Sequence, residues 1–340
     1  DIQGCGVKMI LELQKITFRY GREEPVIDRL DLSIEKGEIY SLLGGSGSGK
    51  TTILNLIAGF VTPEKGGILI DGRNVSAIPP HKRKVGMVFQ DNALFPHMNV
   101  ARNILYGVRK RGKERQRLLE ELLEMVGLSG REKSHVGDLS GGEKQRVALA
   151  RTLAYDPKMV LLDEPLSSLD ESLRASLRKQ MARILREREV SVIHVTHDQK
   201  EAMALADRIG ILHGGKVLEE GSPEKIYSRP EKLQTARFVG ISNIFPVIHD
   251  GSSVRGPFFS IPSKGEPTRY VGIRPDSIKT DGKSHSFSGM VIEREFRGSG
   301  YHITVDVQGT RLEMISGNDR KMGSMMDFSF DPEDIISLEV

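Results

Sequence analysis

Residues Gly44 to Thr52 read GGSGSGKTT, and this short stretch decides the fold. It follows Glu38 to Leu43 (EIYSLL), which is typical of a short buried strand, and it leads into Thr51 to Ala58 (TTILNLIA), whose apolar spacing predicts a helix. A glycine-rich turn between a strand and a helix is the setting in which backbone N–H groups bind phosphates. The stretch therefore predicts a phosphate-binding loop.

The residue types in this loop suit a polyphosphate. Gly44, Gly47 and Gly49 allow the backbone to curl around the phosphates, because glycine adopts positive φ angles at little cost. Lys50 can reach the outer phosphates, and the hydroxyl of Thr51 is a suitable magnesium ligand. The alternative is a glycine turn that only joins strand to helix, and the full match to the pattern disfavours it. The predicted phosphate-binding set is Gly44, Gly45, Ser46, Gly47, Ser48, Gly49, Lys50, Thr51 and Thr52.

Two acids stand at the end of a later apolar run. Lys158 to Pro165 reads KMVLLDEP, which is typical of a buried parallel strand that ends at Asp163 and Glu164. Ligands bind at the carboxyl edge of such sheets. Asp163 is therefore a candidate to hold magnesium, usually through water, and Glu164 is a candidate to polarise the attacking water as general base. The alternative is an acidic turn before the proline.

A second glycine motif lies between these two. Leu139 to Gln145 reads LSGGEKQ, and Ser140 is a suitable N-cap for a helix that begins near Gly141. A helix N-terminus attracts anions because its first N–H groups have no partner within the helix. The turn formed by Ser140, Gly141 and Gly142 is therefore a second candidate site for a phosphate group.

These motifs, in this order, resemble those of the ATP-binding cassette (ABC) family over the range Tyr20 to His197. Tyr20 in FRYG looks like the aromatic residue that stacks on adenine, Gln90 in MVFQDNALFP like the glutamine that senses the γ-phosphate and magnesium, and His197 in VIHVTHDQKEA like the switch histidine. Taken alone, each has an ordinary alternative as a strand aromatic or as a polar residue at a strand end. Ser167 to Asp170 (SSLD) resembles the family's D-loop, and Glu143 stands where many members have Gln.

The resemblance implies an ATPase that works as a pair of identical chains. In the family, two nucleotide-binding subunits pack head to tail, so that the phosphate loop of one copy and the LSGG turn of the other enclose each ATP. Closure positions donors around the γ-phosphate, and hydrolysis then depends on positioning and charge stabilisation. The resemblance assigns Glu164, His197 and Gln90 to catalysis, Thr51, Gln90 and Asp163 to Mg²⁺, and Tyr20, Gly44 to Thr52, Ser140, Gly141, Gly142 and Asp170 to ATP.

The resemblance also implies partners in a membrane. They are transmembrane permease subunits and, through them, an extracytoplasmic substrate-binding protein, with this chain placed peripherally at the cytoplasmic face of the inner membrane. In the family, the segment that corresponds to Asp91 to Val100 lines a groove where a short permease helix docks. Phe95 and Pro96 are candidates for apolar contacts there. The alternative is a hinge turn with buried aromatic residues.

The composition is compatible with this assignment. A formal net charge of +3 over 340 residues is close to balance, so nucleic acid is not an expected partner. The basic run Arg109 to Arg117 is interpreted as the exposed start of an amphipathic helix. No run approaches the ~20 consecutive apolar residues that span a bilayer. The single cysteine, Cys5, excludes an internal disulfide, and we expect a soluble, cytosolic chain. The apolar face of the expected helix consists of Leu118, Leu119, Leu122, Leu123 and Val126.

The pattern divides the chain near residue 238. Residues 1–9 are interpreted as an extension that contributes nothing to the fold. Residues 10–238 alternate strand-like and helical runs, which predicts an α/β P-loop NTPase domain of ABC type with a helical subdomain over about 91–158. Residues 239–340 show short alternating stretches between glycine, serine and proline turns, which predicts an all-β, OB-like domain. Its expected strands are Val271 to Ile278, Gly289 to Phe296, Tyr301 to Val307 and Met326 to Leu338.

This second domain resembles the C-terminal regulatory (TOBE) domain of importer ATPases for ferric iron, polyamines, sulfate, molybdate and sugars. The resemblance rests on FVGISNIF, which starts at Phe238, and on VGIRPDSI, which starts at Val271. The stretch GISNIFP is nearer to the iron and polyamine members. The implied function is therefore the ATP-hydrolysing subunit of an importer for ferric iron or a polyamine, with another small solute as the alternative.

Three other interpretations stay open. An exporter ATPase is one, although it more often lacks such a β-rich tail. A soluble cassette protein of DNA repair or translation is another, although a long coiled-coil insertion or a second cassette would then be expected. In the third, the β domain senses the internal substrate and slows the ATPase. A shared fold does not decide among functions.

Overall fold

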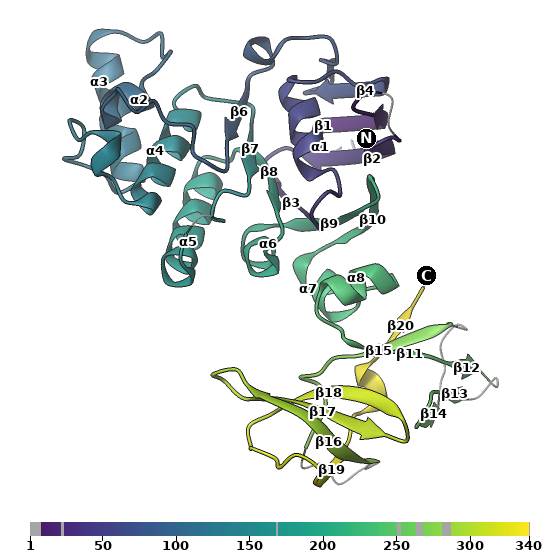
Figure 1. Cartoon of the computed structure of the whole chain (residues 1–340). Coiled ribbons are helices and arrows are strands. Elements are labelled where there is room, and N and C mark those ends of the chain that lie inside the picture. The colour runs from purple at the N-terminus through teal and green to yellow at the C-terminus, as the bar shows by residue number, and fades with distance from the viewer. Residues whose placement is uncertain are drawn as a thin grey trace, which may run out of the picture. The chain divides into compact units, whose positions relative to one another are not determined.

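The computed structural model describes residues 8–21, 24–167, 169–249, 253–262, 268–280 and 287–339. They form two units, one ending at Pro223 and the other beginning at Glu224 (Figure 1). This boundary lies earlier in the chain than the change in sequence pattern near residue 238. The reason is that two short helices are tied to the second unit, where the Leu233 amide donates to the Glu339 carbonyl at 2.8 Å. These helices are α7 (Pro223–Ser228) and α8 (Leu233–Phe238).

The extension predicted at residues 1–9 is described only in part, since residues 1–7 lie outside the described ranges. Lys8 and Met9 belong to the first unit. Strand β1 (Met9–Phe18) begins at Met9, and the Lys8 carbonyl accepts a hydrogen bond of 2.9 Å from the Lys36 amide. The prediction that the extension contributes nothing to the fold was therefore wrong for these two residues.

The centre of the first unit is a sheet whose described strands have the order β10-β9-β3-β8-β7-β6. All neighbours run parallel except β9 and β10, which are antiparallel. Every residue of β3, β7 and β8 is buried, because both faces of the sheet are covered. The strands are β3 (Ile39–Gly44), β6 (Val85–Val88), β7 (Met159–Asp163), β8 (Ser191–Thr196), β9 (Arg208–His213) and β10 (Lys216–Gly221).

Side chains of these strands alternate between two hydrophobic cores. In β7, Met159 and Leu161 join the core that contains α1, whereas Val160 and Leu162 join the core formed with the later helices. The alternation follows from the two-residue period of a strand. An uninterrupted apolar run is therefore what this position in the sheet requires.

Parallel pairing brings the ends of three strands to one edge of the sheet. β3 ends at Gly44, β7 at Asp163 and β8 at Thr196. Because β8 pairs with both β3 and β7, the residues that follow these ends lie together. The fold thus collects the glycine loop, the acidic pair and His197 at one place.

A second, antiparallel sheet covers helix α1 (Lys50–Ala58). Its described strands have the order β2-β1-β4-β5. Leu54 and Ile57 of α1 are fully buried and share one core with Leu11 of β1 and Leu161 of β7. The helix that starts at the glycine loop is therefore held between two sheets. The further strands are β2 (Ile27–Glu35), β4 (Lys65–Ile70) and β5 (Arg73–Asn74).

A group of helices follows β6. The amphipathic helix whose start was predicted within the basic run Arg109 to Arg117 is present and begins at Gly112. Its apolar face is buried in one core with Val147 of α4 and Ile184 of α5. Among the residues of the described ranges, no helix is long and apolar enough to cross a membrane. The helices between β6 and β7 are α2 (Val100–Ile104), α3 (Gly112–Met125) and α4 (Gly141–Leu153), with a short 3₁₀ turn at Val136–Asp138. Elsewhere in the first unit lie α5 (Glu171–Glu187), α6 (Gln199–Leu205) and a 3₁₀ turn at Pro80–Lys82.

The second unit is all-β beyond α8, which confirms the predicted fold class. Its paired strands are antiparallel and form sheets in the orders β11-β15-β20, β12-β13-β14 and β18-β17-β16-β19. Phenylalanines, among them Phe245 and Phe328, fill its core. The strands are β11 (Asn243–Pro246), β12 (Ile248–His249), β13 (Ser253–Arg255), β14 (Ser260–Pro262), β15 (Tyr270–Ile273), β16 (Phe287–Phe296), β17 (Tyr301–Val307), β18 (Thr310–Ser316), β19 (Met325–Phe328) and β20 (Ile335–Leu338).

The stretch Met326 to Leu338 forms two strands, so its prediction as a single strand was wrong. These are β19 and β20, separated by a 3₁₀ turn at Pro332–Asp334, since proline lacks the N–H that a strand interior requires. The strand predicted from Val271 likewise stops at Ile273, shortly before Pro275. Strand β18 was not predicted. It pairs with β17 across a turn in which Gln308 and Gly309 have φ angles of 53° and 84°.

Candidate nucleotide-binding site

The carboxyl edge of the central sheet forms a cleft of about 720 Å³. This volume lies within the range of small-molecule sites. Most of the lining comes from the glycine loop and the start of α1, and two residues follow the ends of β7 and β8. The cleft therefore unites three motifs that lie far apart in the sequence. It is lined by Val26, Ser46, Gly47, Ser48, Gly49, Lys50, Thr51, Thr52, Glu164 and His197.

The loop needs glycine at specific positions. Gly47 and Gly49 have φ angles of 75° and 104°, in the left-handed region. A Cβ at Gly49 would lie 2.7 Å from Cδ1 of Ile27, and a Cβ at Gly44 would lie 2.6 Å from the Leu212 carbonyl oxygen. Gly49 is also the N-cap of α1 and supplies no side-chain hydrogen bond. The first N–H groups of α1 thus remain suited to an anion.

Two polar side chains of the loop fit a polyphosphate. Lys50 is 7% exposed, and its Nζ donates to the carbonyls of Gly44 and Gly45 at 2.9 Å each. Burial lowers the pKa of Lys50, whereas the nearby Glu164 and Asp163 carboxylates oppose that shift. Ser48 Oγ is buried and has no hydrogen-bond partner among the described residues. A phosphate would satisfy both groups.

Asp163 stands where a divalent cation would reach it. Its side chain is 9% exposed, and the Thr51 hydroxyl donates to its Oδ1 at 3.4 Å. Burial raises the pKa of Asp163, and the Thr51 hydrogen bond opposes that shift. A hydroxyl beside a carboxylate provides the oxygen ligands that Mg²⁺ prefers. These residues therefore fit the predicted magnesium site.

The buried carboxylate of Asp163 has a consequence for stability. Its raised pKa means that the folded state holds a proton more readily than the unfolded state, so this residue stabilises the fold less as the pH rises. We expect Asp163→Asn to raise the melting temperature of the nucleotide-free protein at pH 7 by a few degrees, or about 1 kcal/mol. Thermal unfolding checks this. The difference from the unsubstituted chain shrinks toward pH 4, and a lower melting temperature at pH 7 would contradict the argument.

Glu164 and His197 face each other in the cleft. His197 Nδ1 lies 3.1 Å from Glu164 Oε1. Glu164 has a φ angle of 43°, which is rare for a residue with a side chain, and its amide is held by the Val195 carbonyl at 2.9 Å. Backbone strain of this kind is concentrated at functional sites because the surrounding structure must maintain it. Here it directs the carboxylate away from the strand and toward the imidazole.

The structure brings Tyr20 to the loop but leaves Gln90 outside the cleft lining. Tyr20 Oη lies 3.4 Å from Thr52 Oγ1, and its ring packs edge-on against Phe18 with centroids 4.8 Å apart. The ring is 45% exposed, so part of it remains open to a ligand. Gln90 follows β6 and is exposed, but it does not line the cleft.

The second glycine motif and Asp170 also lie outside the cleft lining. Ser140 caps α4, with Oγ accepting from the Glu143 amide at 3.3 Å while the Glu143 carboxylate accepts from the Ser140 amide at 2.8 Å. This capping box gives Glu143 a structural role. Asp170 caps α5 by accepting from the Leu173 amide at 3.0 Å. The helix start predicted at Ser140 is present, and neither this turn nor Asp170 lines the cleft of the same chain.

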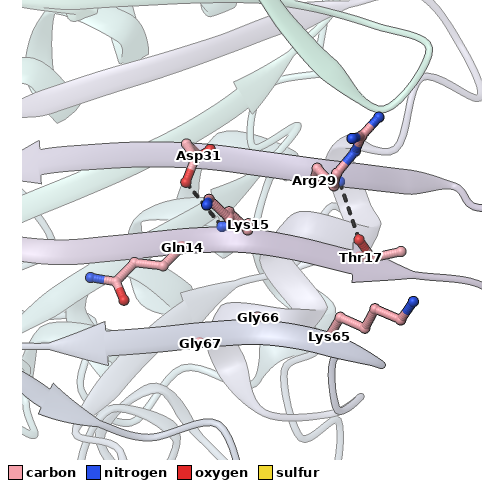
Figure 2. A pocket seen from close by; sticks show the side chains of 8 residues that line it. All are labelled: Gln14, Lys15, Thr17, Arg29, Asp31, Lys65, Gly66 and Gly67. Atoms are coloured by element: carbon pink, nitrogen blue, oxygen red, sulfur yellow. Dashed lines mark hydrogen bonds between the residues drawn. The ribbon is translucent and has the colours of Figure 1, made fainter.

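A second concave surface lies on the antiparallel sheet (Figure 2). Figure 2 shows Lys15 and Arg29 on neighbouring strands, where their φ angles of 49° and 47° mark irregular pairing. The Lys15 amide donates to Asp31 Oδ1 at 2.9 Å, and the Arg29 amide donates to Thr17 Oγ1 at 3.2 Å. Irregularities of this kind bend a strand, and β1 leads to Tyr20.

A buried polar network beside the cleft was not predicted. His194 Nδ1 lies 3.0 Å from Ser41 Oγ, and its Nε2 lies 3.4 Å from Glu201 Oε2. The Thr196 hydroxyl donates to Glu201 at 2.9 Å. Each of these four side chains is at most 2% exposed. The network joins β3, which leads into the glycine loop, to the segment that carries His197. The only sequence signal was a histidine inside an apolar run.

Comparisons with known proteins agree with this geometry. Residues 27–167 match the family model described as ABC transporter, and residues 271–338 match the TOBE domain. The spermidine/putrescine import ATP-binding protein PotA of Borrelia garinii subsp. bavariensis is 37% identical over 338 residues, covering 96% of this chain and 97% of that protein. The Fe(3+) ions import ATP-binding protein FbpC of Streptomyces coelicolor is 38% identical over 340 residues, covering 97% of each.

A solved structure extends the comparison to three dimensions. The ATP-binding cassette MJ0796, a dimer in a post-hydrolysis state bound to ADP and Pi, gives a TM-score of 0.55 at 31% identity and covers 63% of this chain and 98% of its own. The fold and the cleft define a P-loop ATPase of the ABC type. The chain belongs to the ABC transporter family. Within that family it is an ATP-binding subunit whose cassette is followed by a TOBE domain.

Proposed function

We propose that the chain is the ATP-hydrolysing subunit of an importer and that it works as a head-to-tail pair. One observation supports this most directly: the cleft holds the glycine loop, Glu164 and His197, whereas the Ser140–Gly142 turn, also suited to an anion, lies outside its lining. A second copy supplies that turn in the proposed dimer. The dimeric state described for MJ0796 agrees with this arrangement. Sizing the protein with and without ATP tests it.

The proposed roles follow from the geometry of the cleft. Glu164 accepts a proton from the attacking water, and His197, 3.1 Å from it, orients that carboxylate and the γ-phosphate. Lys50 and the N–H groups of the loop bind the phosphates. Thr51, Asp163 and Gln90 bind Mg²⁺, which neutralises charge on the phosphate oxygens when bound. Gln90 joins the site only when the loop that carries it moves toward the cleft.

The remaining nucleotide contacts come from Tyr20 and from the second copy. The exposed part of the Tyr20 ring stacks on adenine, beside the first turn of α1. Ser140, Gly141 and Gly142 of the second copy present the N-terminus of α4 to the γ-phosphate. Asp170 lies at the start of α5, and its proposed role is to contact ATP where the two copies meet.

The loop after Gln90 is the proposed contact with the permease subunits. Phe95 is half-buried against Tyr106, with ring centroids 4.3 Å apart, and Tyr106 is itself 48% exposed. We expect Phe95→Ala to reduce recovery of co-expressed permease subunits about tenfold or more while ATPase of the isolated chain stays unchanged. Phe296→Ala, which alters a phenylalanine of the second unit that is 62% exposed, is the control. Unchanged recovery with Phe95→Ala would defeat this proposal.

A polyamine or ferric iron is the proposed substrate of the complete importer. The similar proteins are named as import ATP-binding proteins for spermidine and putrescine or for Fe(3+) ions. The permease and an extracytoplasmic binding protein select the solute, and this chain sits peripherally at the cytoplasmic face of the membrane. Cells that lack this chain are expected to lose uptake of radiolabelled spermidine or of ⁵⁵Fe³⁺, and the gene restores it. Normal uptake of both would contradict the assignment and favour another small solute.

A further inference from the structure

Arg151 connects helix α4, which begins at the Ser140–Gly142 turn, to the loop that follows Gln90. Its Nη1 donates to the Ala93 carbonyl at 2.7 Å, and its Nη2 donates to the Asn92 carbonyl at 2.9 Å. The guanidinium carbon also lies 5.6 Å from the centre of the Phe95 ring. One planar side chain thus makes two charge-assisted hydrogen bonds and one cation–π contact to a single loop, in a geometry that lysine cannot reproduce.

The two residues that Arg151 holds have an unusual backbone. Asn92 and Ala93 have φ angles of 62° and 43°. For alanine, this left-handed conformation is costly, because its Cβ approaches the backbone and no polar side chain compensates. Such a conformation persists only when neighbouring groups fix it. The guanidinium binds the carbonyls of these two residues and therefore fixes the strained part of the loop to α4.

The other end of the loop is held by a different helix. Asn103 of α2 is fully buried. Its Oδ1 accepts from the Phe95 amide at 2.9 Å, and its Nδ2 donates to the Phe95 carbonyl at 3.1 Å and to the Met98 carbonyl at 3.3 Å. The loop is therefore attached to α2 near Phe95 and to α4 near Asn92. The second attachment is made directly by α4, the helix that begins at the turn proposed to bind ATP.

Helix α4 carries that turn at its opposite end. Ser140 caps its start, and Arg151 lies in its last turn. Arg151 lies eleven positions after Ser140, which corresponds to about 16 Å along an α-helix. An α-helix of this length moves as a rigid body because each turn is hydrogen-bonded to the next. A displacement of the turn by a bound γ-phosphate is therefore transmitted to the Arg151 guanidinium.

We infer that Arg151 is a positioning residue that makes the loop of residues 91–99 follow α4 when the Ser140–Gly142 turn engages ATP. This inference rests on the proposed function, since it requires the turn to bind nucleotide in a dimer. It adds the physical link between the ATP-dependent movement of α4 and the loop on which the permease contact is proposed. Arg151 touches neither the cleft lining nor the turn itself.

Hydrogen–deuterium exchange of the loop tests the link without any membrane subunit. Reporter amides are those of Asn92, Phe95 and Met98, which donate to the Phe89 carbonyl, to Asn103 Oδ1 and to the Phe95 carbonyl. The experiment uses the full chain with Glu164→Gln, so that ATP and Mg²⁺ stay bound. With Arg151 present, ATP is expected to change the exchange rate of the 91–99 peptide about fivefold or more.

Two substitutions of Arg151 and one control complete the design. In Arg151→Gln, the 91–99 peptide exchanges about tenfold faster without nucleotide, and ATP no longer changes its rate, because the charge-assisted bonds are lost. Arg151→Lys gives an intermediate response. Arg183→Gln alters an exposed arginine whose Nε lies 3.7 Å from Glu187 Oε1, and it is expected to behave as the unsubstituted chain.

The peptide that contains Gly44–Thr52 distinguishes the two possible failures. If ATP protects this peptide in every variant and the 91–99 response persists in Arg151→Gln, the link through Arg151 is wrong and the proposed function stands. If ATP protects the 44–52 peptide in none of them, the proposed function itself fails. Loss of protection at residues 44–52 in Arg151→Gln alone would show a general effect on the fold and would also overturn the link.

Discussion

Replacing Glu164 by glutamine is expected to lower ATP turnover by about 10²- to 10⁴-fold, the usual contribution of a positioned general base. Glutamine has nearly the same shape but cannot accept the proton from the attacking water. The role proposed for this carboxylate rests on the strained backbone at Glu164 and on the His197 contact at 3.1 Å. Binding of ATP does not require the carboxylate, so affinity is expected to change little. Steady-state ATPase and ATP-binding measurements check both parts.

The same substitution is expected to trap the dimer. When hydrolysis stops, ATP stays in both sites, and the pair of chains persists on a sizing column with ATP and Mg²⁺. Glu187→Gln is the control, since Glu187 is an exposed glutamate at the end of α5. Turnover like that of the unsubstituted chain would remove Glu164 from its role. A trapped variant that stays monomeric would mean that the membrane subunits are needed to align the two copies.

Replacing Lys50 by alanine is expected to weaken ATP binding about 100-fold or more, since truncating one partner of a buried charge pair has effects of this size. Lys50 is buried, and its ammonium group donates to the carbonyls of Gly44 and Gly45. These two contacts leave a donor for phosphate oxygens. Without Lys50, the cleft loses the lysine that lines it beside the glycine loop. Equilibrium binding of a fluorescent ATP analogue checks the expectation.

Lys65→Ala is the matched control for Lys50→Ala. Lys65 is an exposed lysine on β4 and lines the second concave surface, not the nucleotide cleft (Figure 2). Its substitution is expected to leave ATP affinity within about twofold. Lys50→Ala with unchanged affinity would show that the loop binds nucleotide through its backbone alone.

Local signals predicted the part of the fold that carries the site. The period-two and period-3.6 patterns around Gly44, the apolar run before Asp163 and the capping residue Ser140 each reflect a backbone requirement that nearby residues satisfy. Parallel strands place their carboxyl ends together, so the meeting of Lys50 and Glu164 also followed from the sequence pattern, because sheet topology leaves few alternatives. His197 was assigned to the same site only through the resemblance to the ABC family.

Contacts between distant residues were not predictable in the same way. The boundary between units depends on the Leu233 amide reaching Glu339, and the buried Ser41–His194–Glu201 network depends on packing of β3, β8 and α6. The link from Arg151 to Ala93 joins residues 58 positions apart. None of these pairs leaves a periodic pattern, since each is decided by tertiary packing.

The loop around Gln90 shows how far the candidate site could be predicted from the sequence. The resemblance to the ABC family placed Gln90 among the catalytic residues, yet in this structure Gln90 lies outside the cleft lining. The position of the loop after Gln90 depends on the left-handed backbone of Asn92 and Ala93 and on hydrogen bonds from Arg151 and Asn103. A local motif identifies the residue, here Gln90, but it does not fix the position of the loop that carries this residue.

The most direct test of the composite site is complementation between two inactive variants. Lys50→Ala inactivates the phosphate loop, and Gly141→Asp places a carboxylate at the exposed start of α4, where a built Cβ meets only the flexible Leu169 side chain at 2.9 Å. A mixed dimer of the two has one site with both defects and one site with none. ATPase of each variant alone and of the equal mixture is the measurement. The head-to-tail account predicts recovery of about a quarter of the unsubstituted turnover on mixing, provided that the two sites act independently. A mixture no more active than the separate variants, with mixed dimers shown to form, would contradict it.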